Sequence, residues 1–579
     1  MYTLGINAAY HDSAACLVKN GKVIAAAEEE RFTRIKHGKR PIPFSTYELP
    51  FHAIHYCLKE ARLILSEVDH IAYSYNPFLL LGGITGDTTL LLPLEPSAHP
   101  VSAPWESPWD PLFISSIVNA PRQLADGAPY HLKERFRGAG MNGPYTWHFV
   151  DHHVAHAASA FFASPFSHAA VLTLDGRGEK TTTSYSIGIN SGIERIGEVT
   201  MPHSLGLLYE DVTTYLGFLH SSDEYKVMAL ASYGNPIYVN EFRKIIQVKD
   251  NGIYTIQTPN LEKLFGPARE RGGPLEQHHY DIACSLQVVL EETVLEIIRW
   301  LQKTTGEENL CMAGGVALNC VMNAYLRNKG PFKNIWAQPA AGDAGTALGA
   351  ALWVDARERK GINGKKEYVM EHSFLGPAYS DYEIREFLSR SKLPYRRLMD
   401  HAEEVTDLLV QDKVIGWFQG RMEFGPRALG ARSIIASPLK ACMQDRLNEI
   451  KDREDFRPVA PVVLEEEVSC WFVNGRVSPF MLFVYDVQPD KMNLVPAVCH
   501  IDGSARIQTV RREHNPRYYD LIHAFKLRTG VPVLINTSFN TRGRPIVCTP
   551  IDAVECFFTS PIDALVIGSY VIEKRKERI

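Results

Sequence analysis

The sequence AAVLTLDGRG at residues 169–178 predicts a buried strand that ends in a tight polar turn. Its first six positions are apolar apart from Thr173, as is typical of a strand inside a sheet. Residues 181–189 and 193–199 predict two further strands, which pair across Asn190-Ser191-Gly192. The predicted order is therefore a strand, a polar turn, and a hairpin whose first strand is rich in Ser and Thr.

The N-terminus has the same layout. Thr3–Asn7 predicts a buried strand, and His11-Asp12-Ser13 predicts a polar turn. Ala14–Lys19 and Val23–Ala27 predict a hairpin across Asn20-Gly21, a pair that favours a type I′ turn because both residues tolerate positive φ. Two copies of one unit predict an internal duplication. The alternative is that a hairpin follows a strand twice by coincidence.

The duplicated unit resembles the actin-like ATPase superfamily, in which two such units hold phosphates from opposite sides. The resemblance implies an α/β first domain. A long amphipathic helix is predicted over residues 282–302, and the polar stretch Arg357–Tyr368 is the best linker in the chain. We therefore predict an actin-like domain over residues 1–365 and a second α/β domain over residues 370–579.

The bulk composition excludes several classes of protein. With 45% hydrophobic residues, 22% charged residues and a net charge of −5, the chain has no global field that attracts nucleic acid or an anionic membrane. The ten cysteines include no C-x-x-C pair, which favours reduced thiols in the cytoplasm. No signal peptide is predicted at the N-terminus. The most apolar stretch, Pro77–Leu94, is interrupted by Gly82, Gly83, Gly86 and Asp87, so we predict no membrane span.

A metal constellation is predicted in the first domain. Asp151 is a good N-cap for a helix on which His152 and His156 share one face, at a spacing that suits a single metal ion. Asp175 and Asp343, each beside glycine, are the candidate oxygen ligands. Mixed ligation of this kind suits Fe(II), Zn, Mn or Mg. We favour Fe(II). The alternative, that the two histidines only pack the helix, would hold for an isolated H-x-x-x-H.

A dense set of cationic and hydrogen-bonding residues is predicted in the second domain. Guanidinium groups bind phosphates bidentately, and glycine or proline fixes the direction of several of these side chains. The basic candidates are Arg427 in the turn Gly425–Gly430, then Lys451, Arg457 and Arg506, with Arg432 and Arg453 close by in the sequence. Asn536, Ser538 and Asn540 would add neutral hydrogen bonds. Any one of these arginines alone is more often a solvated surface residue.

Five motifs together resemble the O-carbamoyltransferases of the NodU/CmcH family, which modify antibiotics and nodulation factors. They are DHHVAHAASA at 151–160, LTLDGRGE at 172–179, YKVMALASYG at 225–234, AGGVALN at 313–319 and AGDAGTALGAA at 341–351. The resemblance implies a first domain similar to the proteins that threonylcarbamoylate tRNA, and a YrdC-like second domain that forms carbamoyl adenylate. It further implies that Arg427, Lys451, Arg457, Arg506, Asn536 and Ser538 hold this adenylate.

The resemblance also assigns the transfer step. His11 corresponds to the histidine proposed as general base in the family, and histidine is suited to that role near neutral pH. The co-substrates implied are ATP with Mg and carbamoyl phosphate, and the metal would act as a Lewis acid. Relatives that modify aminoglycosides carry a longer acidic stretch before this histidine, whereas residues 7–10 here are Asn-Ala-Ala-Tyr. A polycationic acceptor is therefore disfavoured.

The expected acceptor is a hydroxyl-bearing natural product. The irregular region of residues 79–126 is predicted to be a lid over it or, alternatively, a surface insertion. Apolar residues of that region, namely Leu91, Leu92, Trp105 and Trp109, favour an apolar or cyclic acceptor. No nucleic-acid or membrane partner is expected, and a homo-oligomer is left open.

Three rival functions are weighed against this one. A tRNA-type transferase would need a broad basic surface, which the net charge of −5 disfavours. The carbamoyltransferase of hydrogenase maturation carries Cys-rich zinc modules, which are not seen in this sequence. An actin-like sugar kinase explains the duplication but leaves the arginines of the second domain without a role.

Overall fold

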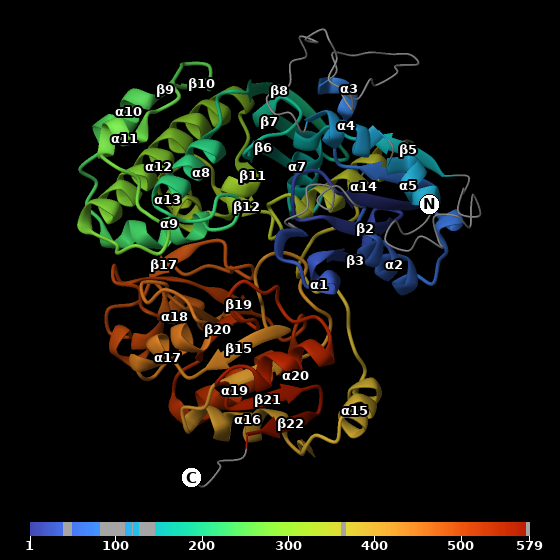
Figure 1. Cartoon of the computed structure of the whole chain (residues 1–579), viewed down its shortest axis with the longest axis vertical. Helices are drawn as coiled ribbons and strands as arrows, with labels where there is room; N and C mark the ends of the chain where they lie inside the picture. Colours follow the sequence, from blue (N-terminus) through green and yellow to red (C-terminus); the bar gives the residue numbers. More distant parts are fainter. Residues whose placement is uncertain (39–48, 81–109, 119, 127–144, 360–365, 575–579) are drawn as a thin grey trace. The chain divides into compact units, whose positions relative to one another are not determined.

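The computed structural model describes residues 1–38, 49–80, 110–118, 120–126, 145–359 and 366–574 (Figure 1). The chain divides into two compact units. Unit 1 comprises Met1–Gly206, Asn309–Val316 and Ala340–Val369, and unit 2 comprises Leu207–Glu308, Ala317–Pro339 and Met370–Ile579. Each unit is thus assembled from separate segments of the chain. The domains predicted at residues 1–365 and 370–579 stay a prediction, because a compact unit of the structure need not coincide with an evolutionary domain.

The first sheet of unit 1 is built from the N-terminal segment. Its strand order is β3-β2-β1-β4-β5, and β1 pairs antiparallel with β2 and parallel with β4. The predicted type I′ turn is confirmed, because Asn20 and Gly21 between β2 and β3 have φ values of 49° and 81°. The strands are β1 (Tyr2–Asn7), β2 (Ala14–Lys19), β3 (Lys22–Glu28), β4 (His70–Tyr73) and β5 (Thr146–Phe149).

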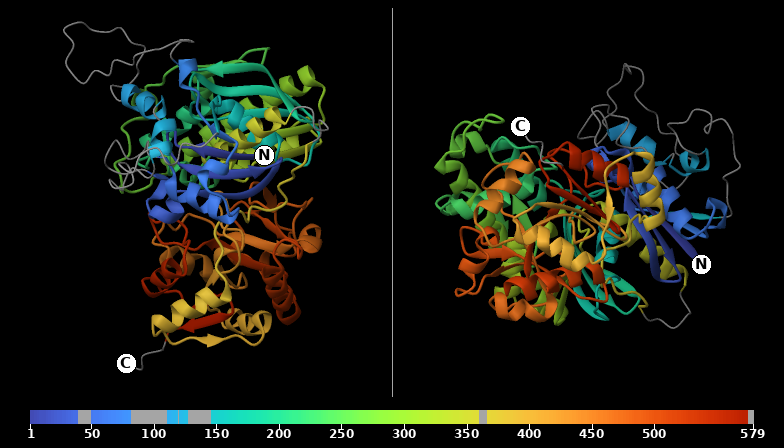
Figure 2. Two further views of the ribbon diagram at one scale, coloured as in Figure 1. Left: turned by 90° about the vertical axis from the view of Figure 1, so that its right-hand side faces the viewer. Right: turned by 90° about the horizontal axis from the view of Figure 1, so that it is seen from below.

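A second set of strands in unit 1 repeats this arrangement. Strand β6 (His168–Leu174) pairs antiparallel with β7 (Thr181–Ile189) and parallel with β11 (Asn309–Ala313), and β7 pairs with β8 (Gly192–Thr200). The order β8-β7-β6-β11 therefore matches β3-β2-β1-β4. The teal ribbon of β6, β7 and β8 is visible in Figures 1 and 2. The predicted duplication is confirmed.

Two helices of unit 1 lie in backbone contact. They are α7 (His152–Phe161) and α14 (Ala344–Glu358). A Cβ atom added to Gly349 of α14 would lie 1.8 Å from the carbonyl oxygen of Ala155 in α7. A Cβ atom on Gly5 of β1 would lie 1.9 Å from the carbonyl oxygen of Ala347. Helix α14 is therefore held against both α7 and β1 at a separation that admits only glycine.

The other helices of unit 1 correct one prediction. Helix α2 (Phe51–Glu60) ends at its cap residue Ala61, and Arg62 follows with φ of 58°. Part of the region predicted to be irregular is helical, since α4 (Asp110–Val118) and α5 (Ala120–Asp126) pack into the core of this unit through residues such as Phe113 and Ile117. Short helices α1 (Glu30–Thr33) and α3 (Pro77–Leu80) complete the set. Residues 81–109, including the predicted acceptor-facing Leu91, Leu92, Trp105 and Trp109, lie outside the described residues.

The first part of unit 2 is mainly helical. The predicted helix at 282–302 is confirmed and longer, because α12 runs from Gln277 to Thr305 and ends at Gly306 with φ of 70°. Around it lie α8 (Leu205–Tyr215), α9 (Glu224–Leu230), α10 (Val239–Ile245), α11 (Leu261–Phe265) and α13 (Cys320–Lys329), with the short strands β9 (Ile246–Val248), β10 (Tyr254–Ile256) and β12 (Asn334–Ala337). Among the described residues, no helix combines the length and apolar character that crossing a membrane requires.

The C-terminal part of unit 2 is built on an eight-stranded mixed sheet in the described chain, drawn in orange and red in Figure 1. Its order is β13 (Arg396–Arg397), β22 (Tyr570–Glu573), β21 (Ala564–Ile567), β14 (Ile415–Phe418), β15 (Arg432–Ala436), β20 (Val533–Ser538), β16 (Ala460–Leu464) and β19 (Gln508–Val510). Strands β17 (Val484–Asp486) and β18 (Ser504–Arg506) form a separate pair. The helices are α15 (Asp381–Arg390), α16 (His401–Val410), α17 (Cys442–Ile450), α18 (Val468–Trp471), α19 (Pro516–Thr529) and α20 (Pro550–Phe558). The chain is thus α/β in both units, as predicted.

A buried carboxyl group on α12 makes stability depend on pH. Burial raises the pKa of Glu291 to about 7 from its ordinary value of 4.5, although Gln287 donates a hydrogen bond to it. In the unfolded chain the group ionises near its ordinary pKa. Stability is therefore lost as the pH rises from about 4.5 through about 7.

We expect Glu291→Gln to stabilise the protein at pH 8 and not at pH 4. The gain at pH 8 is up to about 3 kcal/mol, from a pKa shift of about 2.5 at 1.36 kcal/mol per unit. Urea unfolding at the two pH values measures it. Glu296, exposed on the same helix, supplies the control variant, Glu296→Gln. An equal effect of Glu291→Gln at both pH values would contradict the assignment.

Candidate metal centre and arginine cluster

Three elements of unit 1 bring the four predicted ligands together. The Asp151 side chain caps α7 by accepting a hydrogen bond from the Val154 amide, so His152 and His156 fall on successive turns with ring centroids 4.7 Å apart. Asp175 follows the end of β6, and Asp343 directly precedes α14. All four side chains are buried, and one ligand atom from each lies within 4.8 Å of the others.

The distances among these ligand atoms suit a single ion. His152 Nε2 lies 3.6 Å from Asp175 Oδ2 and 3.5 Å from Asp343 Oδ1. His156 Nε2 lies 3.8 Å and 3.7 Å from the same two oxygens. Ligand atoms that each bond a metal at about 2.1 Å are separated by comparable distances.

The hydrogen bonds around the centre leave the ligand atoms available. His152 Nδ1 bonds to the carbonyl oxygen of Ser74 at 3.1 Å, which fixes the ring with Nε2 toward the other ligands. The Gly315 amide donates to Asp175 Oδ1 at 2.7 Å, so Oδ2 faces the centre. His152 Nε2, His156 Nε2 and Asp343 Oδ1 are buried without a hydrogen-bond partner. Buried polar atoms are normally paired, so this donor set fits a divalent cation.

The electrostatics of the centre keep both carboxylates ionised. Burial alone would raise the pKa of Asp175, but His152 and His156 hold it below the ordinary value. Burial would likewise raise the pKa of Asp343, and His11 with His152 lowers it. His153 has a different role, because its Nδ1 bonds to Thr173 Oγ1 at 2.7 Å and burial lowers its pKa to about 3. His153 is therefore a neutral core residue.

The predicted general base, His11, lies beside the metal centre. Its Nε2 is 3.9 Å from Asp343 Oδ2, and its Nδ1 bonds to Asp12 Oδ2 at 2.9 Å. The other oxygen of Asp12 bonds to His37 Nδ1 at 2.8 Å. Burial opposes ionisation of Asp12, but His37 and then His11 hold its pKa well below the ordinary value. A carboxylate thus orients His11, and the sequence did not single out His37 because it is distant along the chain.

In unit 2, four arginines form a cluster. Burial, and then the charge of Arg506, lowers the pKa of Arg427 to about 9. Burial, and then Arg457 and Arg506, lowers the pKa of Arg453 to about 9. The Nε atoms of Arg427 and Arg506 are buried without a hydrogen-bond partner. Cations that repel one another in a buried site favour the binding of an anion.

The other predicted residues of this half support the cluster. Asn536 donates to the carbonyl oxygen of Ala428 at 3.1 Å and to Gln508 Oε1 at 2.6 Å, so it fixes the turn that carries Arg427. Lys451 Nζ donates to Ser538 Oγ at 3.1 Å and to Asn540 Oδ1 at 2.8 Å. Lys451 therefore already has partners at the end of β20.

Arg432 does not belong to the cluster, which corrects its inclusion among the anion-binding candidates. Its guanidinium is fully buried, lies 3.7 Å from the Phe418 ring centroid and donates to the carbonyl oxygens of Gln419 and Pro377 at 2.9 and 3.0 Å. The physical reason is its position at the first residue of β15, inside the sheet. Arg432 is a structural residue.

The cluster also includes residues that sequence reasoning assigned elsewhere. Tyr225 begins the YKVMALASYG motif, and its ring centroid lies 4.6 Å from the guanidinium carbon of Arg457. Lys226 Nζ pairs with Glu454 Oε1 at 2.9 Å. The motif was visible as a family signature, but no local pattern indicated that it lies against the arginine loop of unit 2.

Comparisons with known proteins find relatives over nearly the whole chain. The family model described as carbamoyltransferase N-terminus matches residues 2–78 and 144–352, and that described as carbamoyltransferase C-terminus matches residues 406–574. An uncharacterized protein of Synechocystis sp. is 42% identical over 99% of this chain and 97% of its own length. The nodulation protein NolNO of Sinorhizobium fredii is 40% identical over 98% of this chain and 80% of its own length.

One further relative and one solved structure are also similar to this chain. The nodulation protein NolO of Bradyrhizobium diazoefficiens is 41% identical over 74% of this chain and 79% of its own length. The crystal structure of HypF from T. kodakarensis aligns with 62% of this chain and 47% of its own at 15% identity, with a TM-score of 0.32, which is too low to add to the fold described above. Both halves of the family's domain pair and the extent of the identity show that the chain belongs to the carbamoyltransferase family and is a carbamoyltransferase enzyme.

Proposed function

We propose that this enzyme makes carbamoyl adenylate from carbamoyl phosphate and ATP and then transfers the carbamoyl group to a hydroxyl group of a small natural product. The observation that carries the proposal is the arginine cluster of Arg427, Arg453, Arg457 and Arg506, in which burial and the neighbouring arginines lower the pKa of Arg427 and Arg453. Such a site favours a ligand with several negative charges, which ATP and carbamoyl phosphate both have. Mg bound to ATP would share in neutralising them.

The first half-reaction takes place in unit 2. Hydrolysis of carbamoyl phosphate gives phosphate and carbamate. An oxygen of the carbamate then attacks the α-phosphorus of ATP, the bond between that phosphorus and the bridging oxygen to the β-phosphorus breaks, and pyrophosphate leaves. Arg427 and Arg506, with buried Nε atoms free of hydrogen bonds, bind the phosphate oxygens.

The second half-reaction uses the residues of unit 1. His11 takes the proton of the acceptor hydroxyl at Nε2, while Asp12 holds its Nδ1. The acceptor oxygen attacks the carbamoyl carbon, and AMP leaves. His152, His156, Asp175 and Asp343 would hold a divalent ion, for which we propose Fe(II), and this ion supplies Lewis-acid stabilisation of negative charge.

An aromatic cluster beside His11 supports an acceptor with apolar character. The Tyr10 ring stacks on Phe113 of α4 with centroids 5.2 Å apart, and meets Tyr75 edge-on at 5.7 Å. The guanidinium carbon of Arg177 lies 5.1 Å from the Tyr10 centroid. We propose that α4, which lies within the 79–126 region, forms part of the acceptor site. We also propose that the enzyme acts in the cytoplasm without a nucleic-acid or membrane partner. Whether it forms a homo-oligomer is a question for direct measurement.

The assay that tests the first half-reaction measures AMP and pyrophosphate released from ATP, with and without carbamoyl phosphate. We expect release only when carbamoyl phosphate is present. ADP as the product would instead indicate an actin-like kinase. A carbamoylated tRNA, with no small-molecule product, would favour the tRNA-type transferase.

Loss of the stack between Tyr10 and Phe113 should weaken the binding of the acceptor and leave adenylate formation unchanged. We expect Phe113→Leu to raise the KM for the acceptor about tenfold, because the buried Phe113 ring holds Tyr10 beside His11 and a stacked ring pair contributes about 0.5–1.5 kcal/mol beyond its buried area. Carbamoyl-phosphate-dependent AMP release without acceptor should be unchanged. Steady-state kinetics measure both, with Phe242→Leu in α10 as the control. An unchanged KM would remove Phe113 from the acceptor site.

A further inference from the structure

A cavity in unit 2 has no role in the proposed reaction. Its volume is about 670 Å³, within the range of small-molecule sites. It is lined by the segment preceding α15, the first turn of α15, the end of β14, the start of α19 and the turn between β21 and β22. None of its lining residues belongs to the arginine cluster.

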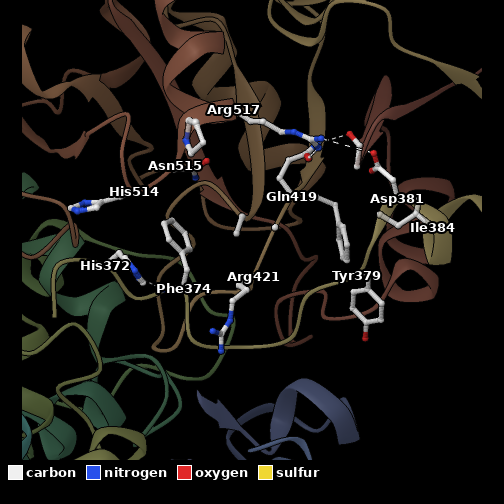
Figure 3. A pocket seen from close by; sticks show the side chains of 15 residues that line it. His372, Phe374, Tyr379, Asp381, Ile384, Gln419, Arg421, His514, Asn515 and Arg517 are labelled. Atoms are coloured by element: carbon white, nitrogen blue, oxygen red, sulfur yellow. Dashed lines mark hydrogen bonds and ion pairs between the residues drawn. The ribbon is translucent and has the colours of Figure 1, made fainter. Parts of the chain in front are cut away.

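Aromatic side chains form two walls of the cavity. Figure 3 shows Phe374 and Tyr379 on different sides of it. The His372 ring stacks on Phe374 with centroids 5.6 Å apart and an interplanar angle of 28°. Burial, and then the charges of His514 and Arg421, lowers the pKa of His372, so this ring is neutral at pH 7. The walls are therefore suited to a flat ring.

Two arginines border the same cavity. Arg421 is held by the main chain, because its Nη2 donates to the carbonyl oxygen of Leu375 at 2.7 Å. Arg517 Nη1 donates to Gln419 Oε1 at 2.8 Å. In Figure 3 the two guanidinium groups lie in different parts of the site. The printed hydrogen bonds thus hold two guanidinium groups at fixed positions around the cavity.

Negative charge at the cavity is limited. Asp381 is the one carboxylate among the lining residues, and its Oδ1 accepts a hydrogen bond from the Ser569 amide at 3.1 Å. Arg517 Nη2 lies 4.0 Å from Asp381 Oδ2. Helix α19, of 14 residues, begins at Pro516 on the cavity wall and adds the positive end of its dipole. The cavity as a whole is cationic.

We propose that this cavity is a second binding site of the enzyme, for a small anion that carries a planar ring. Phe374 and Tyr379 contact the ring, and Arg517, in the first turn of α19, binds its phosphate or carboxylate. Nucleoside monophosphates and heteroaromatic carboxylates share this chemistry. The proposal does not depend on the formation of carbamoyl adenylate in the arginine cluster.

Calorimetric titration of the full-length Arg427→Ala protein tests the site, because this variant weakens the arginine cluster. The probes are AMP, nicotinate, adenosine and inorganic phosphate. We expect AMP or nicotinate to bind at one site, and adenosine and phosphate, which lack the anion or the ring, to bind at least about tenfold more weakly. Binding of AMP would indicate a nucleoside monophosphate as the ligand, and binding of nicotinate would indicate a heteroaromatic carboxylate.

A pair of arginines on α19 provides the matched variants. Arg517→Gln, added to Arg427→Ala, should weaken the binding about tenfold or more. Arg528→Gln, at the other end of the helix and paired with Glu403 and Asp407, should leave it unchanged. If Arg427→Ala does not fold, the test uses the wild-type protein. It should bind two molecules of AMP or one molecule of nicotinate, and Arg517→Gln should lower that number by one.

Two results would overturn the proposal. One is the lack of saturable AMP and nicotinate binding at millimolar concentration. The other is equal binding by the Arg517→Gln and Arg528→Gln proteins. Failure of carbamoyl adenylate formation would remove only the site at the arginine cluster, which depends on Arg427. The proposed reaction and the proposed second site are therefore tested by different measurements.

Discussion

The His156→Gln variant is expected to lose its divalent ion and more than about 100-fold in the rate of carbamoyl transfer, because loss of even an outer-shell partner of a metal ligand costs 10–100-fold. His156 is fully buried, and neither of its ring nitrogens has a hydrogen-bond partner. A bound ion would supply the partner that this imidazole lacks, since buried polar atoms are normally paired. Elemental analysis of the purified protein and an assay of carbamoylated acceptor measure the two effects.

The neighbouring histidine makes a sharp control for this prediction. His153 is on the same helix and equally buried, but its Nδ1 bonds to Thr173. His153→Gln should therefore retain the ion, even if it lowers stability. Carbamoyl-phosphate-dependent AMP release should survive in both variants, because it belongs to unit 2. Equal metal content in the two variants would show that the four residues are not a metal site.

Arg427→Ala is expected to reduce carbamoyl-phosphate-dependent AMP release by about 100- to 1,000-fold, the effect of removing one preorganised group that stabilises charge. The Arg427 guanidinium is buried beside Arg506 and Arg457, and its turn is fixed by Asn536. Its loss leaves the fold of the sheet intact and the metal content unchanged. Pyrophosphate release measures the reaction.

Two further variants serve as controls for this result. Arg427→Lys restores the charge but not the planar fork of donors, so it should recover only part of the rate. Arg446→Ala removes an arginine of α17 that pairs with Asp563 at 2.7 Å, and should keep the wild-type rate. A normal rate in Arg427→Ala would place adenylate formation elsewhere.

The elements that sequence predicts well depend on local chemistry. Asn20-Gly21 specifies its turn because only a few residues tolerate two successive positive φ angles. The spacing of His152 and His156 predicts their convergence because a helix has a fixed pitch. The glycines beside Asp175 and Asp343 pointed to the same centre, and the structure brings all four side chains together.

What the sequence could not predict depends on contacts between distant segments. His37 reaches Asp12 across a separation of 25 residues, and Tyr225 reaches Arg457 across a much longer one. Arg432 and Arg427 look alike in sequence, since both lie near glycine. One is enclosed in the sheet with carbonyl partners, and the other lies among arginines. Only the tertiary structure separates these two cases.

The contact at Gly349 bears on which ion the proposed metal centre would select. Asp343 precedes α14, and the two histidines lie on α7, so the distance between their helices sets the diameter of the coordination sphere. That distance is fixed by main-chain atoms, because Gly349 leaves no side chain between the helices. The ligand side chains therefore have little freedom to change rotamer and accommodate ions of different radius. A methyl group at position 349 would enlarge the sphere and shift the preference toward larger cations, with no ligand replaced.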